Sequence, residues 1–257
     1  MPPDPDAMAE AARLLSSAKN LAVLSGAGIS VESGLPTFRG PEGLWRNVRA
    51  EELATPEAFA RDPSLVWDWY RLRRERMASV APNPAHLALA RLEPRFEAFA
   101  VVTQNIDGLH QKAGSRRVIE LHGNIWRVRC FTHPAHRFGE TETVALEAAA
   151  HGEQVPRCPC GGALRPDVVW FGERLDPEDL EAAVYAVRAA DVLLVVGTSS
   201  VVYPAAALPS TARRAGAVVV EINPEETALS GEAHLALRGP AGVVLPELER
   251  LAGGERT

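Results

Sequence analysis

The sequence is poor in cysteine, with three among 257 residues, and two of these lie close together at Cys158 and Cys160. Three cysteines cannot build the framework of paired disulfides that is typical of small secreted domains. No apolar run approaches the roughly 20 residues that a membrane-spanning helix needs. The first residues, Met1-Pro-Pro-Asp-Pro-Asp6, are acidic and proline-rich, unlike a signal peptide. We therefore expect a cytoplasmic protein that does not contact a membrane.

An excess of positive charge is also missing, because the formal net charge is −6 at pH 7. This balance argues against nucleic acid or an anionic membrane as the main partner. The composition is otherwise that of a globular protein, with 46% hydrophobic and 23% charged residues. The length allows one large domain, or a large domain with a smaller one.

A third absence concerns the glycine-rich stretch after the apolar run 21–24. Gly26 and Gly28 are spaced as in a dinucleotide-binding turn, but the third glycine of G-x-G-x-x-G is missing. No acidic residue ends a following strand about 20 residues on, where the usual ribose contact lies. A turn from a strand into a helix still brings backbone N–H groups close to a phosphate. We expect a ligand here, bound differently from a dehydrogenase cofactor; a tight turn without a ligand is the alternative.

Apolar strands expected at 21–25, 96–103, 191–196 and 217–222 alternate with helices. This alternation predicts an α/β fold, a Rossmann-like parallel sheet with helices on both faces. Polar clusters follow the strands at 26–39, 104–107, 197–199 and 223–225, so they should meet in one crevice at the carboxyl ends of the strands. Residues 8–42, 86–127 and 166–257 would form this domain. The insertions 43–85 (helical) and 128–165 (zinc-binding) would form a smaller lobe.

Local signals place several elements. An amphipathic pattern predicts a helix over 8–19. Thr55-Pro56 and Asp62-Pro63 predict helix starts, since proline suits the first helical position. Residues 168–173 are expected to be extended, and Pro246 is expected to begin the last helix.

The cysteines form two knuckle-like pairs, Cys130-Phe-Thr-His133 and Cys158-Pro-Cys160. Their spacing predicts a zinc site with Cys130, His133, Cys158 and Cys160 as ligands and His136 as a spare candidate. Four protein ligands close the coordination sphere, so such a site would be structural. Three thiols without a metal are the alternative.

Two further positions carry candidate chemistry. His122 follows a short strand near 104–107, where an imidazole that titrates near neutrality suits general-base work. Tyr70 and Arg73 stand three residues apart on one helix and project from the same face, so they could hold a small carboxylate. A merely solvated arginine-rich face, with Arg71, Arg73, Arg74 and Arg76, is the plainer interpretation of the second pattern.

Together these stretches resemble the sirtuins, the NAD-dependent protein-lysine deacylases. The matching motifs span nearly the whole chain in the family's order. They are Gly26-Ala-Gly-Ile-Ser-Val-Glu-Ser-Gly-Leu-Pro-Thr-Phe-Arg39, Thr103-Gln-Asn-Ile-Asp107, Leu121-His-Gly123, Val168-Val-Trp-Phe-Gly-Glu173, Gly197-Thr-Ser199 and Ile222-Asn223. The resemblance implies a Rossmann-like domain and a small zinc-binding lobe, with NAD and an acyl-lysine peptide meeting between them.

The resemblance also implies the chemistry. The acyl amide oxygen attacks the nicotinamide ribose of NAD, and the products are nicotinamide, free lysine and O-acyl-ADP-ribose. His122 would be the general base, with Asn105 and Asp107 holding the carboxamide. The residues implied to contact NAD are Gly26, Ala27, Gly28, Ile29, Pro36, Thr37, Phe38, Arg39, Trp45, Gln104, Asn105, Ile106, Asp107, Gly197, Thr198, Ser199, Asn223, Pro224, Glu225 and Ala241.

Within the family, Tyr70 and Arg73 resemble the pair of the desuccinylase and demalonylase branch, in which it grips the acyl carboxylate and a small residue, here Ala50, leaves room for the chain. Val169, Phe171, Gly172 and Glu173 would pair with the substrate peptide as an added strand. The family's knuckles are two C-x-x-C pairs, whereas His133 stands at one cysteine position here and Cys158 is displaced by one. We expect a monomer. The rival hypotheses are a deacetylase that makes little use of Tyr70 and Arg73, a non-catalytic NAD or ADP-ribose sensor, and a zinc-ribbon nucleic-acid binder.

Overall fold

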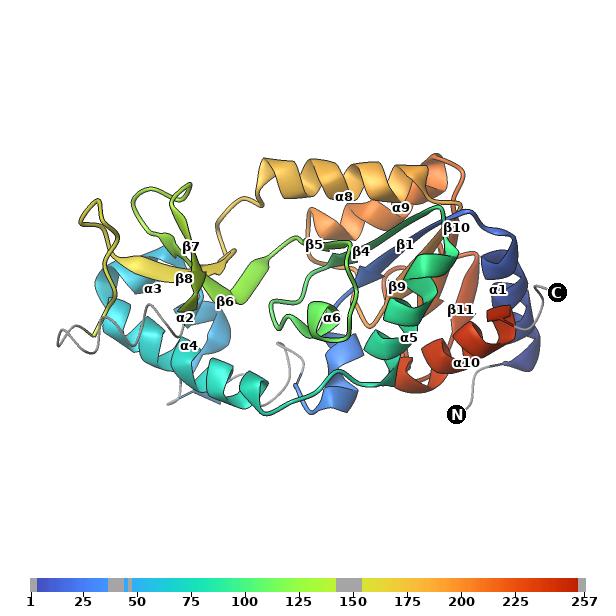
Figure 1. Cartoon of the computed structure of the whole chain (residues 1–257), viewed down its shortest axis with the longest axis horizontal. Coiled ribbons are helices and arrows are strands. Elements are labelled where there is room, and N and C mark those ends of the chain that lie inside the picture. The colour runs from blue at the N-terminus through green and yellow to red at the C-terminus, as the bar shows by residue number, and fades with distance from the viewer. Residues whose placement is uncertain (1–3, 37–43, 46–47, 142–153, 254–257) are drawn as a thin grey trace.

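The structure is a computed structural model that describes residues 4–36, 44–45, 48–141 and 154–253. It has two lobes (Figure 1): a large one around a parallel sheet, and a small one formed by α2, α3, α4 and the strands β6, β7 and β8. In the described ranges no helix has both the length and the hydropathy to cross a membrane. The expected α/β class is confirmed.

The large lobe is organised around six parallel strands in the order β11-β10-β9-β1-β4-β5. The first strand lies in the middle, between β9 and β4, so the chain crosses to the two sides of β1 in turn. Ligands of such sheets bind where the crossovers diverge, at the carboxyl ends of the strands. The strands are β1 (Asn20–Ser25), β4 (Ala98–Thr103), β5 (Val118–Glu120), β9 (Val192–Val196), β10 (Val218–Ile222) and β11 (Leu235–Leu237).

The sheet is covered on both faces because alternate residues of each buried strand point to opposite sides. Leu21 and Val23 pack with α1 (Pro5–Ser17), α5 (Pro84–Leu92) and α10 (Ala241–Gly253). Ala22 and Leu24 pack with α8 (Pro177–Ala189) and α9 (Leu208–Arg214). Shorter helical pieces are η1 (Ala27–Ser33), η3 (Glu93–Arg95), α6 (Leu109–Lys112) and η4 (Ala205–Ala207).

Side-chain caps fix several of the helix starts. Asp4 accepts from Asp6 N, so α1 begins at Pro5, three residues before the predicted start. Asp176 likewise accepts from Glu178 N at the start of α8. Each cap satisfies a backbone donor that the first helical turn leaves without a partner.

The predicted start of the last helix is wrong. Helix α10 begins at Ala241, and Pro246 lies inside it. At its first turn Val244 N donates to Pro240 O at 3.0 Å, and Gly242 N donates to the Glu32 carboxylate at 2.6 Å. Pro246 removes one internal hydrogen bond, but Val244, Leu245 and Leu248 around it are buried in the core. Burial therefore outweighs the cost of an interior proline here.

The small lobe combines two segments far apart in the sequence. Its helices are α2 (Ala50–Leu53), α3 (Pro56–Arg61) and α4 (Pro63–Ala78), and its sheet has the order β7-β6-β8. Thr55 and Asp62 cap α3 and α4 as predicted. The strands are β6 (Gly123–Cys130), β7 (Arg137–Glu140) and β8 (Leu164–Val168), with the hairpin β2 (Leu44–Trp45) and β3 (Val48–Arg49) nearby in sequence.

The core of the small lobe includes Ile125 and Trp170, which lie beyond the predicted insertion 128–165 on either side. Residues 168–173 are only partly extended, contrary to expectation. Strand β8 ends at Val168, and Glu173 N donates to Trp170 O at 3.0 Å in a turn. Gly172 has φ +85°, a backbone conformation that favours glycine and belongs to the turn after the strand.

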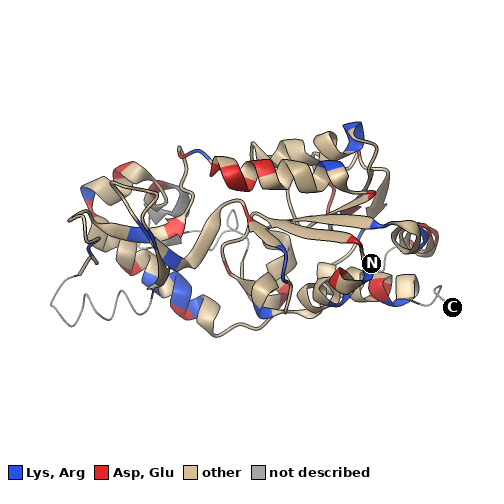
Figure 2. Cartoon of the chain, turned by 45° about the horizontal axis from the view of Figure 1, so that its top comes forward, with Lys and Arg blue, Asp and Glu red and all other residues tan. Residues whose placement is uncertain are grey.

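Charged residues are distributed unevenly over these elements (Figure 2). Basic residues mark α4 and the strands of the small sheet, and acidic residues mark the first turn of α8. Within the small sheet the charges pair: Asp167 accepts from Arg127 at 3.4 Å, and Glu173 from Arg129 at 3.0 Å.

Candidate functional site

A cleft of about 1900 Å³ lies at the carboxyl ends of the large sheet's strands and continues to the small lobe. The segments after β1, β4, β9 and β10 line one wall, and α4 with the segment after β8 lines the other. The volume exceeds the 300–1,000 Å³ or so of a typical small-molecule pocket. The cleft therefore has room for two substrates.

The large-lobe wall depends on glycines that let two loops touch. Gly28 N donates to Gly197 O at 2.7 Å. A Cβ on Gly28 would stand 2.6 Å from Gly197 Cα, closer than any real contact. Gly197 itself has φ +59°, which disfavours a side chain. The glycines that suggested a ligand loop thus also lock the loops after β1 and β9 together.

Side-chain amides continue this connection across the strand ends. Gln104 Nε2 donates to Thr198 Oγ1 at 3.0 Å, and Asn223 Nδ2 donates to Thr198 O at 3.1 Å. Three polar clusters predicted to converge, at 104–107, 197–199 and 223–225, therefore do converge in hydrogen-bonding contact.

Asn105 and Asp107 share Ser30 as a hydrogen-bond partner, and Ser30 was not among the predicted site residues. Ser30 Oγ donates to Asp107 Oδ2 at 2.8 Å and accepts from Asn105 Nδ2 at 3.1 Å. Burial raises the pKa of the Asp107 carboxyl, and hydrogen bonds from Leu109 N and Ser30 act against that shift. Ser30 lies within the motif 26–39. The spacing of that motif does not distinguish a serine that bonds to a neighbouring loop from one that caps a turn.

His122 is held by one ring nitrogen. Its Nδ1 lies 2.9 Å from Gln104 O, and because a carbonyl only accepts, Nδ1 carries the hydrogen. Nε2 of the neutral ring is then the basic nitrogen. Burial lowers the pKa of His122, against the effect of the Gln104 bond, so the ring is neutral at pH 7. His122 lines the cleft as a neutral base of fixed tautomer.

Most of the predicted NAD-contacting residues line the cleft. Ile29 does not, because it is fully buried in the core. Thr37, Phe38 and Arg39 lie outside the described residues, as do the side chains of Trp45 and Ala50. Those that line it are Gly26, Ala27, Gly28, Pro36, Gln104, Asn105, Ile106, Asp107, Gly197, Thr198, Ser199, Asn223, Pro224, Glu225 and Ala241.

Tyr70 and Arg73 both face the cleft from α4. The Tyr70 ring is only 2% exposed, and the Arg73 guanidinium lies 5.0 Å from the centre of the Trp69 ring. Burial lowers the pKa of Arg73, which reports a partly desolvated positive charge. Tyr70 and Arg73 thus belong to the cleft wall, whereas Arg71 on the same helix is exposed.

Val169, Phe171, Gly172 and Glu173 line the same wall. Phe171 is 45% exposed. The Glu173 carboxylate is engaged within the protein: it accepts from Arg165, Arg129 and the backbone N of Trp170. Its part in the site is to hold the segment, and no sequence pattern indicated these partners.

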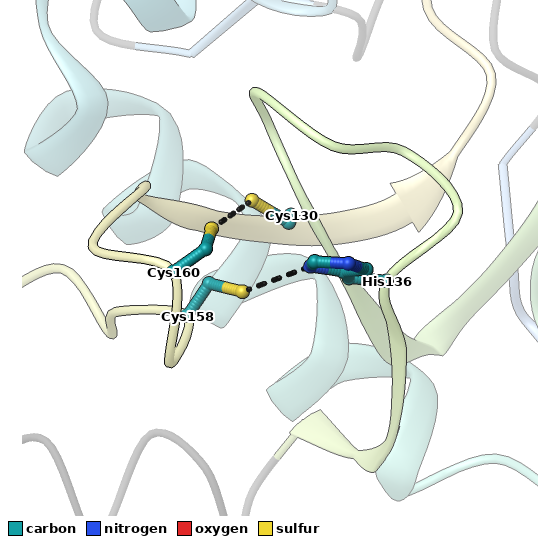
Figure 3. A group of neighbouring side chains, drawn as sticks. All are labelled: Cys130, His136, Cys158 and Cys160. Carbon is teal, nitrogen blue, oxygen red and sulfur yellow. Dashed lines mark hydrogen bonds between the residues drawn. The ribbon is translucent and has the colours of Figure 1, made fainter.

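The cysteine cluster lies in the small lobe, where the β6–β7 hairpin meets the turn before β8 (Figure 3). Cys130 Sγ lies 3.5 Å from Cys160 Sγ, and Cys158 Sγ lies 3.5 Å from His136 Nδ1. The structure corrects the predicted fourth member, because His136 stands in the cluster instead of His133. His136 N donates to His133 O at 2.8 Å, and this turn brings the later histidine towards the sulfurs.

The four ligand atoms lie within 4.8 Å of one another. Ligands about 2.0–2.3 Å from a tetrahedral zinc ion stand about 3.3–3.8 Å apart, and the two pairs at 3.5 Å fit this spacing. Gly162 leaves the necessary space, since a Cβ there would stand 2.9 Å from Cys130 Sγ. Three thiolates and an imidazole are compatible with a structural zinc ion that joins the hairpin to the turn.

Comparison with known proteins agrees with this geometry. The sequence pattern of the Sir2 family matches residues 26–204. NAD-dependent protein deacylase 2 of Pyrobaculum aerophilum is 54% identical, over 92% of each chain. A Sir2 homologue in complex with NAD superposes with a TM-score of 0.85 at 46% identity, over 95% of this chain and 93% of the other. A Sir2 protein bound to a myristoylated histone peptide gives a TM-score of 0.76 at 36% identity, over 97% of each chain. The chain therefore belongs to the Sir2 family of NAD-dependent protein deacylases.

Proposed function

We propose that this Sir2 family member removes succinyl and malonyl groups from protein lysines, consuming NAD. The observation that supports the acyl preference is the pair on α4. Tyr70 and Arg73 lie in the cleft wall opposite the glycine loops, beside buried aromatic rings. A carboxylate there would receive a forked, charge-assisted hydrogen bond from Arg73 and one from the Tyr70 hydroxyl. An acetyl group offers no such partner.

The proposed reaction uses the remaining groups of the cleft. The acyl amide oxygen bonds to the nicotinamide ribose carbon, and the bond to nicotinamide breaks. Neutral His122, with Nε2 basic, then removes a proton from a ribose hydroxyl, which takes the acyl group. With one water consumed, the products are nicotinamide, free lysine and O-acyl-ADP-ribose. Asn105 and Asp107, joined through Ser30, would orient the nicotinamide carboxamide.

Binding of the substrates divides between the two walls. The glycine loops and the residues after β4, β9 and β10 would hold NAD, as the NAD complex of the structural relative supports. The segment 169–173 would receive the acyl-lysine peptide by strand addition. The zinc cluster would hold the small lobe in shape at a distance from the chemistry. We further propose that a single chain is the working unit and that it acts in the cytoplasm.

The test is nicotinamide release from a panel of succinyl-, malonyl- and acetyl-lysine peptides. Arg73→Met should lower kcat/KM for the succinyl peptide by about 100-fold, the effect of losing a charged hydrogen-bond pair. The acetyl rate should change less than threefold or so on the same reasoning. Arg71→Met is the matched control, because Arg71 lies exposed on the same helix and pairs with Glu75 at 2.8 Å. An equal loss on both peptides would refute the acyl preference.

The variant His122→Ala distinguishes the proposed enzyme from a non-catalytic NAD sensor. The variant should lose deacylation with all peptides while it retains NAD binding, since His122 acts on the ribose after nicotinamide leaves. If the wild-type chain releases nicotinamide with none of the peptides, the sensor interpretation replaces the enzyme.

A further inference from the structure

Trp170 lies directly behind the two α4 side chains. It follows strand β8, is 2% exposed, and its Nε1 donates to the Tyr70 hydroxyl oxygen at 2.8 Å. Its ring packs against Phe59, with centroids 5.3 Å apart. Trp170 and Tyr70 line the same cleft. The resemblance of residues 168–173 to the sirtuin motif implied no role for Trp170.

The direction of this hydrogen bond is fixed by chemistry. An indole N–H can only donate, so the Tyr70 oxygen must be the acceptor. The phenolic hydrogen therefore points away from Trp170 and towards another acceptor. Burial raises the pKa of Tyr70, more than the nearby Arg73 charge lowers it, so the hydroxyl keeps its proton at neutral pH. Tyr70 is thereby restricted to donating its hydrogen to something else in the cleft.

We propose that Trp170 is a positioning residue for acyl selectivity, which turns the Tyr70 hydroxyl hydrogen towards an acyl carboxylate held by Arg73. This inference rests on the proposed function of the cleft. A phenol with a free rotor could instead accept from the arginine or from water. With the indole N–H bonded to its oxygen, the Tyr70 hydroxyl directs its hydrogen to an acceptor such as a carboxylate, and it offers nothing to the methyl end of an acetyl group.

The protein fixes Trp170 from its backbone and from its ring face. Trp170 N donates to Glu173 Oε2 at 2.8 Å. Arg165, 2% exposed, donates to Glu173 Oε1 and to Val168 O, both at 2.5 Å. The guanidinium carbon of Arg165 lies 3.2 Å from the centre of the Trp170 ring. The ion pair of buried Arg165 with half-buried Glu173 thus holds the indole in the orientation that Tyr70 requires.

The experiment removes the indole N–H and keeps an aromatic ring. Trp170→Phe should raise KM for the succinyl-lysine peptide about tenfold, a fold-change typical of one hydrogen bond to a charged group. The ratio of succinyl to acetyl kcat/KM should fall by the same factor, because any loss of peptide binding through the segment 169–173 affects both peptides alike. In the Tyr70→Phe background the second substitution should have no further effect on succinyl KM, because the hydroxyl it orients is gone.

Trp67→Phe is the matched control. Trp67 is also buried in the small lobe, and its Nε1 donates to Leu164 O at 2.9 Å rather than to Tyr70. It should lower stability without changing the ratio of succinyl to acetyl activity. If Trp170→Phe fails to fold, replacement of the indole by the isosteric benzothiophene keeps the ring volume and removes only the donor, and the same KM change is expected.

Three results would overturn the inference. One is an equal loss on both peptides, as for a merely structural tryptophan. Another is a Tyr70→Phe/Trp170→Phe protein whose two effects add. The third is a wild-type enzyme without preference for acidic acyl groups, which refutes the proposed function as well. A wild type that prefers succinyl-lysine, combined with an unchanged ratio in Trp170→Phe, refutes the role of Trp170 alone.

Discussion

The two walls of the cleft are built from different materials. The large-lobe wall is held together by backbone contacts and side-chain amides: Gly28 against Gly197, and the amides of Gln104 and Asn223 on Thr198. The small-lobe wall consists of aromatic rings and buried charges, with Arg165 and Glu173 beneath Trp170. The second wall thus depends on long side chains, and the first on close approach of the backbone.

This difference matches the two proposed substrates. NAD is the same in every turnover, so a wall of interlocked backbone, which tolerates no added Cβ at Gly28, suits it. The acyl group is what distinguishes one substrate from another, so the wall of side chains sets the choice. The two walls should accordingly fail in different ways when they are perturbed.

The largest effect is expected from the metal cluster, which would support only the small-lobe wall. Structural zinc in zinc-finger peptides contributes about 10–16 kcal/mol of apparent binding free energy at pH 7. Chelation, or Cys158→Ala, should therefore unfold the small lobe and abolish deacylation. Elemental analysis should give close to one zinc per chain, and the zinc should leave with the activity. A metal-free chain of full activity would contradict this assignment.

A comparison of His136 with His133 tests the same zinc site residue by residue. His136→Ala should weaken zinc retention strongly, because His136 Nδ1 stands in the cluster. His133→Ala, three residues earlier on the same hairpin, should retain zinc like the wild type. The reverse result would restore the ligand that the sequence suggested.

The second effect concerns the large-lobe wall. Gly28→Ala places a methyl group 2.6 Å from Gly197 Cα, so one of the two loops must move. KM for NAD should rise and kcat/KM should fall by about 100-fold, equivalent to about 2.7 kcal/mol. Both acyl peptides should be affected alike, since this wall does not contact the acyl group. Gly231→Ala is the control, as a Cβ there meets nothing within 4 Å. A loss of activity on the succinyl-lysine peptide alone would contradict the proposal that the large-lobe wall binds NAD and the small-lobe wall selects the acyl group.

The sequence predicted the large-lobe wall well because parallel strands force their ends together. Once 21–25, 96–103, 191–196 and 217–222 were identified as strands, the polar residues after them had to meet. Strand β11 and the start of α10 escaped prediction, since Leu235–Leu237 is too short to show a pattern and Pro246 imitates a helix start.

The small-lobe wall was predictable only in part. Resemblance to the family indicated Tyr70 and Arg73, but no local pattern relates Trp170 to Tyr70, which stands 100 residues earlier. The fourth member of the cysteine cluster was predicted as His133, with His136 only as a spare candidate, for a similar reason. The choice between His133 and His136 depends on how the β6–β7 hairpin turns, and spacing along the chain does not contain that information.

The smallest effect should appear in acid, beneath the large-lobe wall. His110 is 1% exposed, its Nε2 lies 2.9 Å from Ser25 Oγ, and its ring centre lies 4.9 Å from that of His86. Burial, and then the neighbouring His86, lower the pKa of His110 to about 3. Burial lowers that of His86 to about 4. Both rings are therefore neutral in the folded chain at pH 5.5, whereas in the unfolded chain they bind protons below about pH 6.5.

Because the unfolded state binds more protons, stability should fall as the pH drops below about 6.5. Between pH 7 and 5.5 the contribution of His110 is about 1 kcal/mol. His110→Gln, whose amide can still reach Ser25, should lose correspondingly less stability over that interval when unfolding is measured in urea. Zinc ligands also take up protons in acid, but they do so in both proteins, so the difference between the two slopes isolates the histidine. Equal slopes would mean that His110 is already protonated in the folded chain, and the large-lobe wall would then rest on a buried charge just as the small-lobe wall does.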